Sequence, residues 1–426
     1  MLQRYHIKNA RVLDTQAHKH ESADILLEYD NGVYTVLDVG YKLKEDSARI
    51  VNASSLCAAP AFVDLWAHIG EIGFEYRESF TTGTTAAISG GYGYVLLAPD
   101  GKTSVDSPAI LEKRMKEATA SSKCRVGFCA ALSKGMKGNK LNDFEALKSA
   151  GAVAFSDGKN ESLSDDLLFD SMKHLAKNGS LFIGHPRYHK IYSDRPVNLG
   201  RISKILGVKG IPATAEALDV ARYILYAAET GCRLHLCGIS CKASLELIAE
   251  AKSRSIAVTA STSPQYFSMT DNDILFYGSR AKVYPPLRRS DDVSAVISAL
   301  ADGTLDCISS DHTPLAVEEK GSDIKTALDG SIGLQTAFSA AYTYLLESGK
   351  IDIYRLIELM SDSPASILGL DFKIKPNTDG YLNLLSLDRE FIVTGNYLKS
   401  RSSNSIYMGL NLRGCVEHSF VSNRFS

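Results

Sequence analysis

The sequence predicts an α/β protein: a closed (β/α)8 barrel of the TIM type with a small flanking β-sandwich domain built from both ends of the chain. Between residues 57 and 372, short apolar segments alternate with helical patterns about eight times. At this length such alternation predicts a parallel sheet that closes on itself. Strand patterns without intervening helices occupy residues 1–56 and return at 373–426. Neither end segment is long enough to bury a core alone, so we expect the two to pair into one domain.

The predicted elements follow in chain order. N-terminal strands cover residues 6–13, 23–29 and 33–39, and an Asp-Asn-Gly turn joins the last two, because Asn-Gly favours tight hairpins. The barrel strands are expected at 61–65, 92–98, 152–155, 181–184, 233–237, 256–260 and 306–309. Helices are expected at 108–120, 164–176, 214–230, 244–253, 291–302, 331–348 and 353–361, and tail strands at 381–387 and 391–395.

Composition restricts the class of protein. The chain has 426 residues, of which 45% are hydrophobic and 23% charged, and its 47 basic and 49 acidic side chains give a net charge of −2. With no basic stretch, we expect neither nucleic acid nor a membrane surface as a partner. No long apolar run or leader is present, which predicts a cytoplasmic protein. The eight cysteines form no CxxC pair and are interpreted as small buried side chains.

Chemically capable residues follow the predicted barrel strands where each strand ends, which is where active sites of such barrels lie. They are His68, Asp100, Asp157, His185 and Asp311. Neutral imidazole and carboxylate oxygen bind zinc at about 2.0–2.2 Å, and zinc lowers the pKa of bound water to about 7. Taken alone, Asp157 before Gly158 is more typical of a turn, and Asp311 is equally typical of a helix cap. Several such residues at equivalent strand ends favour a hydrolytic metal site.

Several motifs identify a family. Pro60-Ala-Phe-Val-Asp-Leu-Trp-Ala-His, Gly73-Phe-Glu-Tyr-Arg-Glu, Gly151-Ala-Val-Ala-Phe-Ser-Asp-Gly, Pro285-Pro-Leu-Arg, Ser310-Asp-His-Thr-Pro, Pro364-Ala-Ser-Ile-Leu-Gly and Ser400-Arg-Ser-Ser-Asn occur in this order over nearly the whole chain. The chain thereby resembles the dihydroorotases of the amidohydrolase superfamily, in the long bacterial type related to the domain of multifunctional pyrimidine-synthesis proteins. The resemblance implies a cyclic amide hydrolase that interconverts carbamoyl aspartate and dihydroorotate with two zinc ions.

Four metal-site positions of this family survive. By resemblance, His68 is the second histidine of the HxH pair, Asp157 the bridging aspartate and His185 a ligand of the second metal. Asp311 corresponds to the aspartate that contacts metal and moves the proton, so it is the predicted catalytic residue if the chain is active.

Two metal ligands of the family are replaced. Trp66 stands where the first HxH histidine belongs, and Gly238 replaces the histidine of a His-Val-Ser motif. His235 is no obvious substitute, because it lies three residues back and points to the opposite face of its strand. Each metal therefore lacks one imidazole.

The substrate pocket is altered as well. The family binds the substrate carboxylate with an arginine, an asparagine and a histidine, which here are Gly70, Asp100 and Leu315. Losing such charge-assisted contacts removes about 1.5–3 kcal/mol each, and Asp100 adds repulsion against a carboxylate. Tyr284 replaces an asparagine on the floor of the same pocket.

Three hypotheses follow from these replacements. The first is a dihydroorotase homologue that is catalytically impaired or inactive and is a structural partner of aspartate carbamoyltransferase, as related non-catalytic homologues are, within a homodimer or larger assembly. The alternative is an active single-metal amidohydrolase acting on dihydroorotate or another cyclic amide, with at most one zinc site on the surviving residues. The third retains the original activity through unusual ligands, Cys237 or Asp100.

Overall fold

Eight parallel strands form the barrel, in the order of the chain, in a computed structural model that describes residues 2–159, 163–192 and 194–423. They are β6 (Phe62–Ala67), β7 (Tyr92–Leu97), β8 (Arg125–Ala130), β9 (Ala154–Phe155), β10 (Leu181–Gly184), β13 (Arg233–Leu236), β14 (Val258–Thr262) and β15 (Cys307–Ile308). The ring closes where Ala67 pairs with His312, and the His68 amide donates to the His312 carbonyl at 2.8 Å. The predicted fold class is confirmed.

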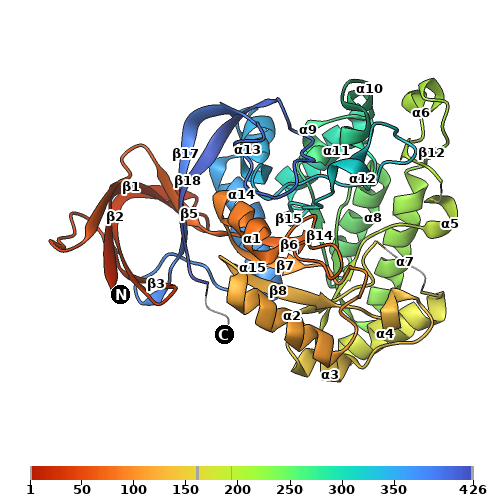
Figure 1. The fold of residues 1–426 in the computed structure, drawn as a ribbon, viewed down its shortest axis with the longest axis horizontal. Coiled ribbons are helices and arrows are strands. Elements are labelled where there is room, and N and C mark those ends of the chain that lie inside the picture. Colours follow the sequence, from red (N-terminus) through yellow and green to blue (C-terminus); the bar gives the residue numbers. More distant parts are fainter. Residues whose placement is uncertain (1, 160–162, 193, 424–426) are drawn as a thin grey trace.

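Helices cover the outside of the barrel (Figure 1), which explains why the strands are apolar on both faces. They are α1 (Phe80–Ser89), α2 (Pro108–Ser121), α3 (Phe144–Ser149), α4 (Asp165–Lys177), α7 (Thr214–Thr230), α8 (Lys242–Ser253) and α11 (Ser290–Asp302). Local chemistry sets their ends. Ser79 and Thr82 form a capping box at the start of α1, and Gly231, with φ 72°, ends α7 in the left-handed conformation.

Both ends of the chain build a second, mixed sheet beside the barrel, where the red and blue strands meet in Figure 1. Its strands are β1 (Gln3–Asp14), β2 (Lys19–Asp30), β3 (Val33–Gly40), β4 (Arg49–Asn52), β5 (Cys57–Pro60), β16 (Thr378–Asp379), β17 (Tyr381–Ile392) and β18 (Asn411–Val421). β5, which the predicted boundary at residue 57 assigns to the barrel, pairs with β1 and β17 in this sheet. The chain then enters β6, so the barrel and the sheet are joined directly; the boundaries of the domains stay a prediction.

Besides several strands of two to four residues, two longer strands, β8 and β18, lie outside the sequence prediction. β8 is interrupted by Gly127, which hides its apolar pattern; the structure needs glycine there, because a Cβ would lie 1.9 Å from the Tyr94 hydroxyl oxygen. β18 was also not predicted, and the tail strands expected at 381–387 and 391–395 are largely one long strand, β17, with bulges. The helix expected at 331–348 begins only at α13 (Ala337–Ala341).

Shorter elements decorate the loops and the region before the tail. α5 (His189–Tyr192), β11 (Val197–Asn198), α6 (Arg201–Ile205) and β12 (Gly210–Ile211) lie between β10 and α7, and α9 (Gln265–Ser268), α10 (Ile274–Tyr277) and α12 (Val317–Lys320) follow β14 and β15. α14 (Ile353–Ile357) and α15 (Ser363–Leu368) lead to the tail. Within the described residues, no helix has the length and apolar character needed to cross a membrane. All eight cysteines are buried and unpaired, as the sequence predicts.

Candidate active site

An indole lies at the centre of the predicted site, against both surviving histidines. Trp66 comes next to last in β6 and is fully buried. Its ring centroid is 6.0 Å from that of His68 and 5.9 Å from that of His185. The structure therefore brings the two remnant ligand positions together, and the space next to both is filled by a side chain that has no lone pair to offer a metal.

Gly238 lies directly against His185. It has φ 73°, and a Cβ built on it would be 3.3 Å from the His185 Nε2 atom and 3.4 Å from the Pro285 Cδ atom. A side chain at this position is thus strained by the backbone and crowded by the imidazole. The present conformation of this loop is suited to glycine.

His185 is a neutral, fully buried imidazole. Burial lowers its pKa well below the usual value, and the positive charges of Lys159 and Arg187 add to this effect. Neither ring nitrogen has a hydrogen-bond partner among the described residues. The ring stacks on Tyr284 at a centroid distance of 5.6 Å, and the Tyr284 hydroxyl donates to the Pro186 carbonyl at 2.8 Å. Tyr284 therefore forms a fixed wall of the site.

His68 has acquired an acidic partner. Its Nδ1 atom is 2.8 Å from Glu71 Oε1 and 3.9 Å from Asp100 Oδ2. Burial lowers the pKa of His68, but the attraction and hydrogen bond of Glu71, together with Asp100, outweigh it and raise the pKa above the usual value. The pKa of Glu71 is lowered in turn by His68 and Arg77, which outweigh its own burial. Glu71 thus holds the imidazole by its Nδ1 atom and favours its charged form, which has no lone pair for a metal.

The oxygens of Asp157 are all used by a neighbouring loop. Oδ1 accepts from the backbone amides of Leu132 at 2.7 Å and Ser133 at 3.0 Å, and Oδ2 accepts from the Ser133 hydroxyl at 2.5 Å. Burial raises the pKa of Asp157 to about 6 despite these bonds, and the negative charge of Asp100 contributes. The side chain anchors the segment after β8.

A lysine is the partner of Asp311. The Lys159 Nζ atom lies 3.3 Å from Asp311 Oδ1, and the amide of Gln265 donates to Oδ2 at 3.3 Å. The charge of Lys159 also favours the ionised forms of Glu71 and Asp100 and disfavours the charged forms of His68 and His185. A fixed ammonium group therefore lies among the predicted ligands.

The other predicted substrate positions, Gly70 and Leu315, are packed against neighbouring residues. A Cβ on Gly70, with φ 59°, would lie 3.3 Å from the Phe80 ring, and Leu315 is buried with its amide on the Asn404 side chain. Arg77 pairs with Glu319 through two nitrogens at 2.6 and 2.7 Å, so it holds the loop after β6 rather than a substrate.

These residues do not fit two zinc ions. Of the four remnant ligands, His68 is bonded to Glu71 through Nδ1, Asp157 is bound by backbone amides, and Asp311 is paired with an ammonium group. The fourth, His185, keeps the lone pair of its unprotonated ring nitrogen but lies against Gly238 and Trp66. His235 cannot replace the lost imidazole, since both its ring nitrogens bond to the hydroxyls of Thr259 and Ser261. The recruitment of Cys237 stays a hypothesis: the thiol is fully buried, and burial raises its pKa well above the usual value.

Sequence reasoning did not single out Glu71, Lys159 or Gln265. The signal for Glu71 was its position three residues after His68, in a loop where the family motif drew attention to other residues. His68, Glu71 and Asp100 each offer a donor atom within 4.8 Å of the others, the one such cluster found among the described residues. The one signal for Lys159 in the sequence was its position directly after Asp157 and Gly158.

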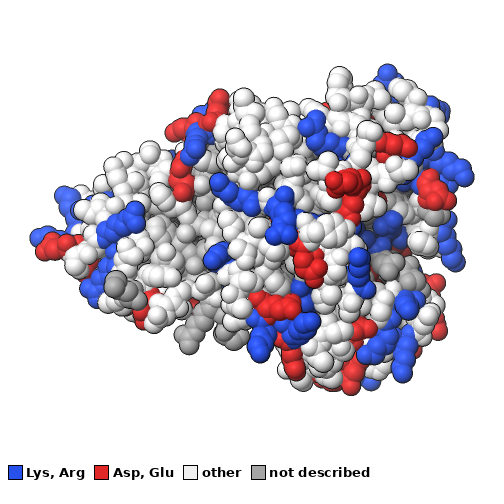
Figure 2. Space-filling view, viewed as in Figure 1, with Lys and Arg blue, Asp and Glu red and all other residues white. Residues whose placement is uncertain are grey.

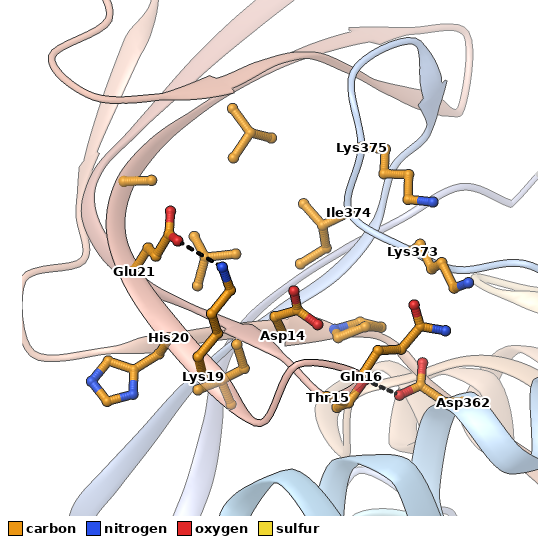
Figure 3. Close-up of a pocket in the computed structure, with 15 residues that line it drawn as sticks. Asp14, Thr15, Gln16, Lys19, His20, Glu21, Asp362, Lys373, Ile374 and Lys375 are labelled. Atoms are coloured by element: carbon orange, nitrogen blue, oxygen red, sulfur yellow. Dashed lines mark hydrogen bonds and ion pairs between the residues drawn. The ribbon is translucent and has the colours of Figure 1, made fainter.

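A surface pocket lies away from this site, where the turn between β1 and β2 meets the segment from Asp362 to Lys375 (Figure 3). It has a volume of about 330 Å³, and its described lining includes none of the predicted site residues. Lys19 pairs with Glu21 at 3.2 Å and Thr15 donates to Asp362 at 2.5 Å, so part of its charge is already satisfied.

A parallel barrel with histidines and aspartates at its strand ends, flanked by a mixed sheet from both chain ends, defines the amidohydrolase superfamily. Solved structures agree on the fold: L-hydantoinase (dihydropyrimidinase) from Arthrobacter aurescens covers 100% of this chain and 96% of its own with a TM-score of 0.85 and 23% identity. Dihydropyrimidinase from Brevibacillus agri NCHU1002 covers 99% and 95% with a TM-score of 0.83 and 19% identity.

Sequence comparison narrows the class to one family. Residues 57–244 match the dihydro-orotase-like family model. The dihydroorotase of Elusimicrobium minutum is 36% identical over 98% of this chain and 96% of its own length. That of Thermoanaerobacter sp. is 35% identical over 97% and 95%. The chain belongs to the dihydroorotase family.

Proposed function

We propose that this chain is a dihydroorotase-family protein without dihydroorotase turnover, and that it works as a non-catalytic partner of aspartate carbamoyltransferase in the cytoplasm. The ion pair between Lys159 and Asp311, with Nζ and Oδ1 3.3 Å apart, is the observation that carries the loss of turnover. In the family this aspartate contacts metal and moves the proton. Here an ammonium group and the Gln265 amide occupy its two oxygens.

Further replacements support the same conclusion. Trp66 fills the space of one imidazole ligand, and Gly238 replaces another in a loop where a side chain would be crowded by His185 and strained by the positive φ. One lost positioning or electrostatic contact can lower an enzymatic rate by about 10²–10³, and several are absent together.

The proposal of aspartate carbamoyltransferase as the partner rests on the family and not on a binding surface of this chain. Related non-catalytic homologues support aspartate carbamoyltransferase, and a barrel that keeps its fold while its metal site changes suits that role. We propose a homodimer or larger assembly for the chain, on its own or with that partner.

The test is a paired measurement on the full chain, with the dihydroorotase of Elusimicrobium minutum as the active control. Metal content is measured by elemental analysis after purification, and dihydroorotate hydrolysis is followed by ultraviolet absorbance. We expect no stoichiometric zinc, no turnover, and co-purification with aspartate carbamoyltransferase from the same organism. One or two tightly bound zinc ions with turnover would refute the loss of activity, and absence of a complex would refute the partner.

A second candidate function rests on the cluster of His68, Glu71 and Asp100, whose donor atoms lie within 4.8 Å of one another. These side chains would hold one divalent cation, which activates water as a Lewis acid when bound. The substrate would then be dihydroorotate or another cyclic amide, the latter favoured because the carboxylate contacts are replaced. The raised pKa of His68 and the charge of Lys159 oppose cation binding.

This candidate makes a distinct prediction. A bound metal that is lost in Glu71→Gln and Asp100→Asn, but retained in Asp157→Asn, would establish it. Metal binding that depends on Asp157 would instead restore the family arrangement.

A further inference from the structure

Cationic side chains from four separate segments line one pocket beside the barrel mouth. The pocket-lining residues come from 187, 192 and 194–196 around α5, from 207–209 before β12, from Lys282, and from 325–329 after α12. The pocket has a volume of about 630 Å³ and is lined by five cationic side chains against two carboxylates: Arg187, Arg195, Lys209, Lys282 and Lys325, with Asp194 and Asp329. Figure 2 shows Lys and Arg atoms, with some Asp and Glu atoms between them, along the edge that carries α5 and β12.

The carboxylates do not neutralise this charge. Asp329 is engaged from two sides, because its Oδ2 atom accepts from the Tyr192 hydroxyl at 2.7 Å and its Oδ1 atom lies 3.9 Å from the Lys282 Nζ atom. Among the described residues, neither Lys209 nor Lys325 pairs with a carboxylate, and both are exposed. The pocket thus keeps an excess of positive charge on a chain whose net charge is −2.

Arg187 is held in place at the inner wall. Its guanidinium carbon lies 3.6 Å from the centroid of the Tyr192 ring and 4.6 Å from that of Tyr284, and Nη1 donates to the Lys159 carbonyl at 3.3 Å. Its Nε atom has no hydrogen-bond partner among the described residues. An arginine stacked on aromatic rings is preorganised to donate to an anion, because little side-chain entropy remains to be lost.

Lys282 and Arg195 complete the wall with charges fixed by backbone carbonyls. The Lys282 Nζ atom donates to the Ala327 carbonyl at 2.6 Å, and Arg195 Nη1 donates to the Gly210 carbonyl at 2.8 Å. Gathering five cations in one cavity costs repulsion during folding, and an anion bound between them offsets that cost.

We propose that this pocket binds a small molecule carrying two phosphate groups or a diphosphate. A phosphate monoester carries about −1.5 to −2 charges at neutral pH and three acceptor oxygens, so two phosphate groups match the excess of positive charge better than one carboxylate does. Arginine forks and lysine ammonium groups are the usual partners of such oxygens. The site lies outside the remnant metal centre and does not depend on whether the chain hydrolyses an amide.

The test is calorimetric titration of the full chain with pyrophosphate, inorganic phosphate and succinate, at low and raised sodium chloride. We expect one pyrophosphate per chain, weaker binding of inorganic phosphate, and affinity that falls with salt. In Lys209→Gln/Lys325→Gln the pyrophosphate affinity should fall about tenfold or more, because two charge-assisted contacts are lost. The matched control, Lys137→Gln/Lys140→Gln, removes two exposed lysines elsewhere and should bind as the parent does.

Three results would overturn the proposal. They are no pyrophosphate binding at low salt, equal loss of affinity in both double variants, and tighter binding of succinate than of pyrophosphate. Both substituted pairs are exposed, so folding of the variants is readily verified by circular dichroism before titration.

Discussion

Replacing Asp157 by asparagine tests whether this buried carboxylate anchors the neighbouring loop or bridges metal ions. The pKa of Asp157 is raised to about 6 by burial, whereas an unfolded aspartate titrates near about 3.9. The folded state therefore binds a proton more tightly than the unfolded state does. The stability that this preference contributes is fully present below about pH 3.9 and is lost as the pH rises through about 6.

The magnitude follows from the difference between the two pKa values. About two units correspond to about 3 kcal/mol in total, of which about 1.4 kcal/mol is lost between about pH 5 and pH 7.5. Asparagine keeps an oxygen for the Leu132 and Ser133 amides and an amide group for the Ser133 hydroxyl, but it does not titrate. Relative to the parent, Asp157→Asn should therefore gain about 1.4 kcal/mol of stability over this range.

The chain contains its own probe for this measurement. Trp66 is the single tryptophan and is fully buried, so its fluorescence reports unfolding of the barrel centre. Urea unfolding of the parent, Asp157→Asn and the exposed control Asp46→Asn is followed at both pH values, with refolding checked. A stability difference that does not change with pH would refute the argument. A loss of stability at neutral pH that is accompanied by loss of metal would instead make Asp157 a ligand.

Three further substitutions test the packing of the site and one buried ion pair of the barrel domain. Trp66→Ala should lower the free energy of unfolding by about 3–5 kcal/mol, because it leaves a large cavity. Urea unfolding followed by circular dichroism measures this loss, with Trp66→Phe as the milder control. A loss below about 1 kcal/mol, roughly the size of a surface substitution, would contradict the packing. Gly238→Ala should lower the free energy of unfolding more than Gly231→Ala does. Both residues have φ near +72°, but only at Gly238 would a Cβ contact neighbouring atoms. Equal losses would show that this crowding is unimportant. Arg288 and Glu216 form a buried ion pair, with Nη2 and Oε2 3.1 Å apart. Arg288→Met should lower the free energy of unfolding by about 3–5 kcal/mol, because it leaves the Glu216 carboxylate buried without its partner. Adding Glu216→Gln should recover part of this loss, and no recovery would mean that the ion pair is not the cause.

Sequence periodicity was sufficient for the architecture because most barrel strands are short, mainly apolar segments that alternate with helical patterns. It failed at β8, where a glycine required by the Tyr94 hydroxyl breaks the run. It also failed at β18, where polar residues interrupt the apolar ones and buried positions do not alternate regularly with exposed positions. Both failures arise from contacts between segments that no local window contains.

The candidate site was predictable as a set of positions but not as a set of interactions. The family motifs located Trp66, His68, His185 and Gly238, and the structure brings these four together. They gave no indication of Lys159, because an ammonium group on a loop after β9 acquires meaning only when folding places it 3.3 Å from a carboxylate oxygen.

The replacements at this site compensate one another in volume and in charge. A metal centre without its cations would leave Glu71, Asp100 and Asp311 as buried carboxylates whose mutual repulsion and desolvation oppose folding. Here Lys159 pairs with one of them, and the His68 imidazole lies beside the other two, which raise its pKa. Trp66 fills the volume that an imidazole and metal would otherwise share. Restoring one histidine at position 66 would therefore not restore the centre, because the ammonium group would still repel an incoming cation and Gly238 would still lack a ligand.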